Sequence, residues 1–224
     1  MKNCYQLTSD FGVAVESGIT AYKAIKNKIL SFEYAPGYQL KEIPLAEELN
    51  LTRTPIRKAI VKLENEGLVK TYPHRGAFVV SLSREEIDEI FEVREALELK
   101  AASLAIRRAS REELDRIQSA LEKRESAVSI TKPKYVVPDI DFHQELIKLS
   151  KNGILISMWM GLHGKLQLIR IQSSMIGGRF LAAIREHKKI LSCIYDNRLA
   201  ETEQLLRDHI QNAKPRLHAT SRKS

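Results

Sequence analysis

The sequence predicts a mainly α-helical protein, in which an N-terminal winged helix-turn-helix with a small two-stranded β wing precedes an all-α helical bundle. Residues 43–50 and 54–66 show the apolar spacing of two short helices that meet at a turn. Residues 68–80 contain two short apolar runs around a basic, glycine-containing tip, which is typical of a wing. From residue 84 onward, apolar residues recur at helical spacing without strand-like alternation.

The length of 224 residues is enough for two modest domains. Residues 1–18 carry no strong periodicity and are predicted to form a loose tail. We place the winged helix-turn-helix at residues 19–80, with a first helix over 20–32, and the helical domain at residues 84–218.

The helical domain should contain about six helices arranged as a bundle. Ser83 and Glu86 have the spacing of a capping box, which predicts that a helix begins there. Two prolines, Pro133 and Pro138, predict a loop over residues 126–138. The expected helices cover residues 84–108, a segment from 110, and then 139–151, 154–173, 179–196 and 198–216.

The second helix of the helix-turn-helix begins like a DNA-reading helix. Thr52 can cap it, Pro55 suits its first turn because proline has no N–H to leave unpaired, and Gly67 can end it. Arg53 and Arg57 lie four residues apart, so both can project from one side of the helix start. Helix N-termini attract phosphates, and arginine forks fit guanine edges. The pattern predicts a recognition helix for double-stranded DNA.

The charge distribution agrees with an anionic partner. The formal net charge is +8, and residues 50–76 contain six Lys or Arg against two acidic residues. The alternative is a small helical domain whose basic residues are only solvated, but that alternative explains neither the start of the helix nor the wing. The residues predicted to contact DNA are Thr52, Arg53, Thr54, Arg57, Lys58, His74, Arg75 and Gly76.

Cysteine content and hydropathy indicate the cellular compartment. Cys4 and Cys193 are too few and too scattered for a disulfide framework or a thiolate zinc site. No apolar run approaches the length of a membrane span, and the N-terminus lacks an apolar signal core. We therefore expect a soluble cytoplasmic protein without a membrane partner.

A second group of residues, in the helical half, has the chemistry of a metal site. Asp139 and His143 lie four residues apart at a helix start, while His187 and His209 occupy inward positions on two apolar helices. Nitrogen and oxygen donors of this kind suit Zn²⁺, and also Ni²⁺, Mn²⁺ or Fe²⁺. A histidine on an apolar helix face is more often a hydrogen-bonded core residue than a ligand, so both interpretations stay open at this point.

Two series of motifs run along the chain. The first comprises Pro36-Gly37, Leu40-x-Glu42, Leu45-Ala46-x-x-Leu49, Thr52-Arg53-Thr54-Pro55-x-Arg57, Glu66-Gly67-Leu68 and Arg75-Gly76. The second comprises Val93-Arg94-x-x-Leu97-Glu98, Asp139-x-x-Phe142-His143, Asn152, Glu186-His187 and Arg207-x-His209. The first series resembles the winged-helix domain of GntR-type bacterial transcription regulators. The second resembles the FCD ligand-binding domain of the FadR-like subfamily, in its six-helix, VanR-like form.

This resemblance implies a ligand-responsive, DNA-binding transcription regulator, most often a repressor, that binds operator DNA as a homodimer and is not an enzyme. It also implies a divalent metal ion, zinc first, with a small organic-acid effector that places a carboxylate on the metal. Arg94 matches an arginine that would contact this carboxylate. The positions that match the metal ligands of the family are Asp139, His143, His187 and His209.

The chain departs from the family pattern at two positions. Ile43 stands where some FadR-like members have a DNA-contacting arginine, and Lys58 replaces a glutamate that is usual after the recognition-helix arginine. Two alternatives also remain for the metal site. The metal could be purely structural, crosslinking three helices. The chain could instead be a metal-dependent hydrolase with an appended DNA-binding domain, although it lacks a glutamate base in a His-Glu-x-x-His arrangement.

Overall fold

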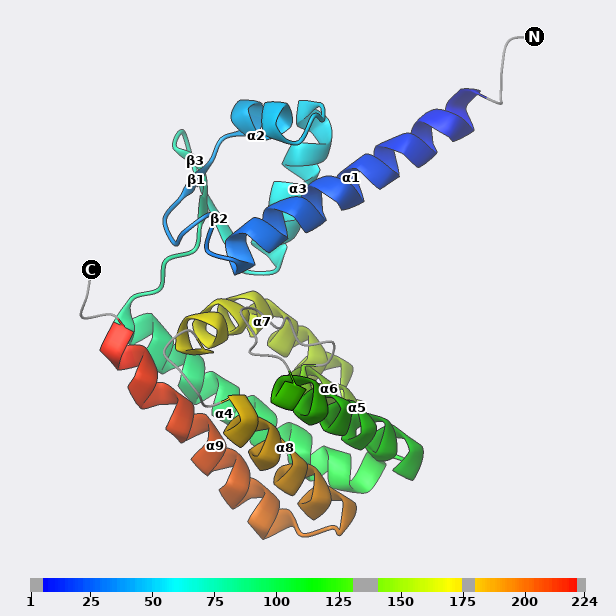
Figure 1. Cartoon of the computed structure of the whole chain (residues 1–224), viewed down its shortest axis with the longest axis vertical. Helices are drawn as coiled ribbons and strands as arrows, with labels where there is room; N and C mark the ends of the chain where they lie inside the picture. The colour runs from blue at the N-terminus through cyan, green and yellow to red at the C-terminus, as the bar shows by residue number, and fades with distance from the viewer. Residues whose placement is uncertain (1–5, 131–140, 175–179, 221–224) are drawn as a thin grey trace. The chain divides into compact units, whose positions relative to one another are not determined.

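The computed structural model describes the backbone of residues 6–130, 141–174 and 180–220 (Figure 1). The chain forms two compact units, Met1–Leu82 and Ser83–Ser224. Within the described residues it is mainly helical, with a small antiparallel sheet in the first unit, as the sequence predicted.

The first unit is a winged helix-turn-helix in which α1 packs along α3. Ala21, Ile25 and Ile29 recur every four residues, so they share one face of α1, and all three are fully buried. Ile56 and Leu63 of α3 are equally buried and complete this core. The elements are α1 (Gln6–Leu30), β1 (Gln39–Leu40), α2 (Glu42–Glu48), α3 (Arg53–Asn65), β2 (Val69–Tyr72) and β3 (Gly76–Val79).

The sheet has the strand order β1-β3-β2, and both pairings are antiparallel. The β2–β3 hairpin is the predicted wing, with Val69 opposite Val79. In addition, β1 pairs with β3 and places Gln39 opposite Phe78. The sequence did not predict β1, because two residues are too few to show an alternating pattern.

The ends of α3 show one confirmed prediction and one wrong one. Gly67 ends the helix in the left-handed region at a φ of 75°, which glycine adopts without steric cost. Thr52 occupies the N-cap position, but its side chain makes no capping hydrogen bond. A capping side chain accepts from the N–H of the second or third helical residue, and the third residue here is Pro55, which has no N–H.

The N-terminal tail prediction is also wrong where the structure describes it. The predicted first helix, 20–32, begins much earlier, because α1 starts at Gln6 and so includes most of the 1–18 segment. The segment contains no proline, and extending an existing helix costs far less than nucleating a new one.

The second unit is a helical bundle in which α4 contacts α6, α7, α8 and α9 (Figure 1). The predicted capping box is present at the start of α4. The Ser83 hydroxyl accepts from the Glu86 N–H at 3.1 Å, and the Glu86 carboxylate accepts from the Ser83 N–H at 2.8 Å. The helices are α4 (Arg84–Arg108), α5 (Arg111–Ile130), α6 (Phe142–Leu149), α7 (Gly153–Ser174), α8 (Phe180–Tyr195) and α9 (Leu199–Thr220).

Two helix boundaries in the bundle differ from the prediction. The loop was predicted to start at residue 126, but α5 continues to Ile130. Helix α6 begins at Phe142 rather than 139, because Asp141 is its N-cap and accepts from the His143 N–H at 3.2 Å. Asp139, one of the predicted metal ligands, lies outside the described residues.

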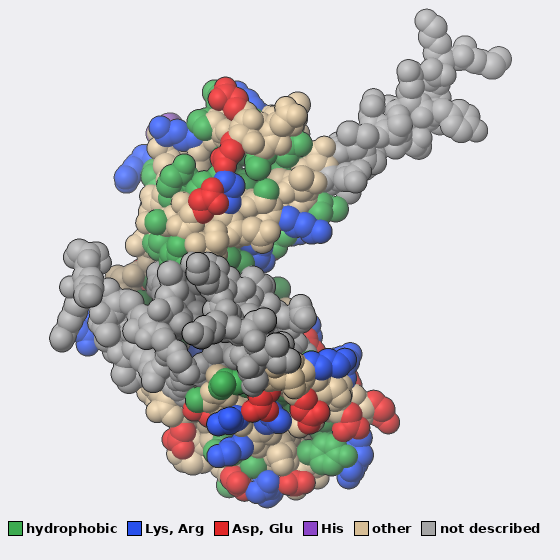
Figure 2. Space-filling view, viewed as in Figure 1, with side chains coloured by type: hydrophobic (Ala, Val, Ile, Leu, Met, Phe, Trp, Pro, Cys, Tyr) green, Lys and Arg blue, Asp and Glu red, His purple; other side chains and the backbone are tan. Residues whose placement is uncertain are grey.

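The bundle has an apolar interior and a mixed surface. Phe142, Leu146 and Trp159 are among its largest fully buried side chains. Lysine, arginine and acidic side chains are interspersed over the described face of the second unit in Figure 2. In the part of the chain that the structure describes, no helix is both long and apolar enough to span a membrane.

Candidate DNA-reading surface and histidine centre

Helix α3 has one buried face and one exposed face. Pro55, Ile56 and Ala59 are buried against the first unit. The opposite face presents guanidinium, ammonium and hydroxyl groups at the helix N-terminus, a set that can contact both phosphates and base edges. The exposed residues among those predicted to contact DNA here are Thr52, Arg53, Thr54, Arg57 and Lys58.

A carboxylate on α2 joins the two arginines of this surface. Arg57 donates from Nε to Glu42 Oε1 and from Nη2 to Glu42 Oε2, both at 2.9 Å. Arg53 donates from Nη2 to the same Oε2 at 3.0 Å. The hydrogen bonds from Arg57 hold the pKa of the Glu42 carboxyl below its usual value; burial opposes them, and the hydrogen bond from Arg53 adds to the lowering. Sequence reasoning missed this role of Glu42, because the contact joins two helices and no periodicity links the residues.

The wing tip presents the other three predicted DNA contacts, and all three residues are exposed. His74 and Gly76 both have positive φ values, 59° and 90°, which makes the turn tight. Two hydrogen bonds hold Arg75 at the tip. Its N–H donates to the Tyr72 carbonyl at 3.1 Å, and its carbonyl accepts from Gln39 Nε2 at 2.8 Å. The short strand β1 therefore supports the tip of the wing.

Three of the four predicted metal ligands meet inside the bundle. His143 comes from α6, His187 from α8 and His209 from α9, and all three are buried. The Nε2 atoms of His187 and His209 are 3.2 Å apart, and those of His209 and His143 are 3.3 Å apart. The nitrogens of all three rings lie close enough to bind one ion. We call this group the histidine centre.

Carboxylates contact the outer nitrogens of two of these rings. Nδ1 of His143 lies 2.8 Å from Glu98 Oε2, and Nδ1 of His209 lies 2.6 Å from Glu186 Oε2. A carboxylate at Nδ1 favours the tautomer that has its proton there, which leaves Nε2 as a lone-pair donor. The Nε2 lone pairs therefore face one another across the centre. Neither Glu98 nor Glu186 was among the site residues predicted from the sequence.

Burial keeps two of the imidazoles neutral. It lowers the pKa of His209 to about 4, although the hydrogen bond with Glu186 acts in the opposite direction. Burial, together with the neighbouring His209 and His143, lowers the pKa of His187 well below its usual value. Neutral imidazole is the form that binds metal ions, so this pair is ready to bind at neutral pH.

Arg94, the predicted effector contact, borders the histidine centre. Its Nε donates to Glu98 Oε1 at 2.7 Å, and its Nη2 lies 3.0 Å from His143 Nε2. Both Arg94 and Glu98 are buried. Burial alone raises the pKa of Glu98, but His143 and Arg94 beside it lower that pKa to about 2. Arg94 thus forms an ion pair with Glu98 and also reaches Nε2 of His143.

Asp141 is a second aspartate close to the centre, but its carboxylate already has other partners. Its Oδ2 accepts from Arg170 Nη2 at 2.8 Å and lies 3.8 Å from Nδ1 of the buried His163. Burial raises the pKa of Asp141, but Arg170 lowers it more, so the carboxylate is ionised. Asp141 thus pairs with Arg170 and caps α6. Asp139 therefore stays the predicted carboxylate ligand.

The donor set of the histidine centre fits a divalent metal ion. Two nitrogens bound to one zinc ion at about 2.0–2.1 Å are roughly 2.8–3.0 Å apart at octahedral angles and roughly 3.3–3.4 Å apart at tetrahedral angles. The two Nε2 separations, 3.2 and 3.3 Å, lie close to the tetrahedral values.

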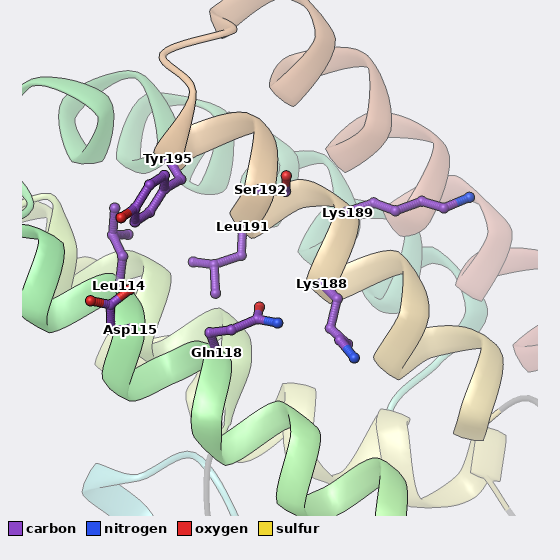
Figure 3. A pocket seen from close by; sticks show the side chains of 8 residues that line it. All are labelled: Leu114, Asp115, Gln118, Lys188, Lys189, Leu191, Ser192 and Tyr195. Carbon is purple, nitrogen blue, oxygen red and sulfur yellow. The ribbon is translucent and has the colours of Figure 1, made fainter.

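A surface groove between α5 and α8 is separate from both sites. In Figure 3, Leu191 and Tyr195 of α8 face the α5 side of the groove, while Lys189 points away from it. None of the predicted site residues lines the groove. Its lining residues are Leu114, Asp115, Gln118, Lys188, Lys189, Leu191, Ser192 and Tyr195.

Comparisons with known families match both units. Residues 19–79 match the model of bacterial regulatory proteins of the gntR family, and residues 89–212 match the FCD domain model. The HTH-type transcriptional regulator YdhC of Bacillus subtilis is 30% identical over 171 residues, which span 75% of this chain and 76% of YdhC.

Solved structures share the fold at lower identity. McbR/YncC of E. coli has a TM-score of 0.69 at 20% identity, covering 92% of this chain and 98% of that one. The FCD domain of TM0439, described as metal-free, has a TM-score of 0.52 at 21% identity, covering 61% of this chain and 94% of its own. The matched domains and relatives are those of regulators, which removes the hydrolase alternative. The chain belongs to the GntR family of bacterial regulatory proteins, and it is a DNA-binding transcription regulator with an FCD domain.

Proposed function

We propose that the FCD domain binds one divalent metal ion, zinc first, through His143, His187, His209 and Asp139. Nickel, manganese and iron are the alternative metals, since the same donors suit them. The convergence of three buried imidazoles on one point is the observation that supports this proposal. Glu98 and Glu186 orient two of the rings, as carboxylates behind metal-binding histidines commonly do. The metal would supply a Lewis-acid centre for an oxygen ligand.

The effector in this proposal is a small organic acid. Arg94 Nη2 lies beside His143 Nε2, so a buried guanidinium borders the proposed metal position. Two cationic groups at such short range repel unless an anion lies between them. A carboxylate satisfies both, because one oxygen can bind the metal while the other accepts from Arg94.

We further propose that residues 19–80 bind the operator, that residues 84–218 sense the effector, and that the chain acts as a repressor. An effector alters operator binding only if its affinity differs between the DNA-bound and the free protein. Titrating the effector with and without operator DNA tests this coupling. Equal affinities in the two titrations would remove the allosteric claim.

Metal content is the direct test of the site. The protein is purified without a chelating tag, and its metals are counted by plasma mass spectrometry. We expect about one divalent ion per chain in the parent and little in His187→Ala or Asp139→Ala. His163→Ala is the matched control, since His163 is also a buried histidine but lies outside the centre. A parent that holds no metal even after soaking in Zn²⁺ would contradict the proposal.

A purely structural metal is the remaining alternative, and calorimetry separates it from a sensing role. Zinc-loaded protein is titrated with a panel of mono-, di- and tricarboxylates. We expect at least one to bind, and to bind more weakly to Arg94→Lys, which keeps the charge but loses the fork geometry. If chelation lowers the melting temperature and no carboxylate binds, the metal is structural.

We also propose that the regulator is a homodimer, because paired winged helices read two half-sites and gain affinity. The exposed face of α7 supports this. Ile154 and Met158 are 75% and 56% exposed, and no lysine, arginine or acidic residue occurs from Gly153 to Gly164. An apolar helix face of this kind is typical of a contact between proteins, and a second copy offers the same face in return.

Analytical ultracentrifugation tests the dimer. Met158→Glu should convert the dimer to monomer and weaken operator binding, because a charge in an apolar interface is costly to desolvate. Leu199→Glu is the matched control, since Leu199 is an exposed apolar residue on α9 rather than α7. A parent that sediments as a monomer at operator-binding concentrations would contradict the proposal.

A further inference from the structure

The inference concerns Glu42 of α2 and rests on the DNA-reading role proposed for α3. We propose that Glu42 is a positioning residue for sequence recognition. Its carboxylate fixes the guanidinium groups of Arg53 and Arg57 in one arrangement, which α3 then presents to the major groove. The same negative charge weakens binding to DNA of arbitrary sequence.

The hydrogen bonds show how one carboxylate controls two side chains. Glu42 Oε1 accepts from Arg57 Nε, while Oε2 accepts from the Nη2 atoms of both Arg57 and Arg53. The pair with Arg57 is bidentate, so it fixes the plane of that guanidinium as well as its position. Because Arg53 shares Oε2, the spacing between the two guanidiniums is also fixed.

Arg57 keeps enough donors to read a base. A guanidinium has five N–H groups, and Glu42 takes one on Nε and one on Nη2. The edge formed by Nη1 and the second Nη2 hydrogen remains directed away from the carboxylate. This edge is the fork that contacts O6 and N7 of guanine. The carboxylate therefore orients Arg57 without using up its reading edge.

The exposed fractions of the three side chains indicate that the carboxylate lies behind the arginines. The side chains of Arg53 and Arg57 are 58% and 64% exposed, whereas that of Glu42 is 27% exposed. Ion pairs this exposed contribute little to folding stability. The cluster is therefore better explained by the arrangement that it gives to the arginines than by the stability that it adds to the domain.

The charge of Glu42 also acts on binding itself. With Glu42, the cluster has a net charge of +1 instead of +2, which reduces the attraction to phosphates that any DNA offers. Oriented arginines meanwhile lose less conformational entropy when they contact a base. One residue thus lowers non-specific affinity and raises specific affinity. The ratio of the two affinities determines how well the protein distinguishes its operator from other DNA.

The experiment uses the full-length protein and two DNA probes. The first is the duplex enriched by the parent protein from a pool with a randomised central segment, and the second is the unselected pool. Dissociation constants for both are measured by fluorescence anisotropy at several salt concentrations. Glu42→Gln removes the charge, Glu42→Asp keeps the charge but retracts the carboxylate, and Glu47→Gln removes a charge from an exposed position of α2 outside the cluster.

For Glu42→Gln we expect affinity for the unselected pool to rise roughly threefold to tenfold at low salt, because a repulsive charge is lost. Affinity for the enriched duplex should fall roughly threefold to tenfold, because the arginines are no longer oriented. If it rises instead, the rise should be smaller than the rise in affinity for the pool. Glu42→Asp should bind the pool like the parent yet discriminate less. Glu47→Gln should discriminate as well as the parent.

Two results would overturn the inference. If Glu42→Gln and Glu42→Asp both discriminate as the parent does, Glu42 does not position the arginines. If Glu47→Gln loses as much discrimination as Glu42→Gln, the effect is one of charge alone. A different failure, in which the parent enriches no sequence and Arg57→Ala binds the pool unchanged, would reject the DNA-reading role of α3 itself. Circular dichroism melts of each variant confirm that the domain is folded.

Discussion

The two units use the same pair of residue types, arginine and glutamate, in opposite ways. On the first unit, Glu42 pairs with Arg53 and Arg57 at the surface, and the arginine side chains are mostly exposed. In the second unit, Glu98 pairs with Arg94 in the bundle interior, where their side chains are 0% and 10% exposed. The surface pair can exchange its partners for DNA, whereas the buried pair cannot separate without leaving a charge in the core.

This difference follows from solvation. Water stabilises separated surface charges almost as well as the ion pair does, so such a pair adds little to stability. Inside a bundle there is no such compensation, and removing one partner leaves the other unpaired in a low-dielectric medium. Exposed pairs therefore suit binding surfaces, and buried pairs suit the fixed framework of a ligand site.

The largest expected effect comes from breaking the buried pair. Glu98→Gln should lower the free energy of unfolding by about 3–5 kcal/mol, because Arg94 and His143 both lose their carboxylate. Urea unfolding followed by circular dichroism measures it. Glu95→Gln is the matched control on the same helix, since Glu95 pairs with Arg207 at the surface and its loss should cost less than about 1 kcal/mol. Equal losses for both variants would refute the distinction between the two pairs.

The next effect is the response of the buried centre to metal. Zinc at about 100 times its dissociation constant should add about 2.7 kcal/mol to the stability of the parent. His187→Ala should gain almost nothing, while His163→Ala, which lacks a histidine outside the centre, should gain as much as the parent. Differential scanning calorimetry with and without Zn²⁺ gives both values. A full gain in His187→Ala would place the metal elsewhere.

Removing an arginine from the surface pair should affect binding and leave folding almost unchanged. Arg57→Ala is expected to weaken binding to the enriched duplex by roughly 5- to 150-fold, because a bidentate base contact or a close phosphate contact is lost. Fluorescence anisotropy at constant salt measures this loss. If Arg57→Ala binds as tightly as the parent, Arg57 does not read DNA.

The smallest expected effect is on the stability of the first unit when the surface pair is broken. Glu42→Gln should shift the melting temperature by no more than a few degrees, since its partners remain solvated. A thermal melt followed by circular dichroism is sufficient. A large loss of stability would mean that the surface cluster is part of the folding framework, and the contrast with Glu98 would disappear.

The sequence predicted helix α3 well because its signals are local. The start, apolar face and end of α3 lie within one segment, so periodicity, Pro55 and Gly67 were enough to define it. Pro55 also removes one of the two N–H groups that the Thr52 side chain could have capped, which the sequence already shows. Glu42 was missed because its contact with Arg57 depends on how α2 and α3 pack.

In the bundle, sequence reasoning identified the histidines but not their supports. Inward positions on apolar helices, together with the family resemblance, were enough to select His143, His187 and His209. The contact between Glu186 and His209 depends on the rotation of α8 relative to α9, which a pattern along one helix does not define. The early start of α1 was missed because residues 6–17 lack a clear apolar stripe.

Helix α4 is one continuous helix from its capped start to the histidine centre. Its capped start at Ser83 follows the last residues of the wing segment, and the same uninterrupted helix carries Arg94 and Glu98 at the histidine centre. From Ser83 to Arg94 the helix rises about 16 Å. Because the helix is uninterrupted, its two ends move together. A tilt of about 10° about the buried pair would carry its capped end through about 3 Å, a displacement large enough to break and remake hydrogen bonds.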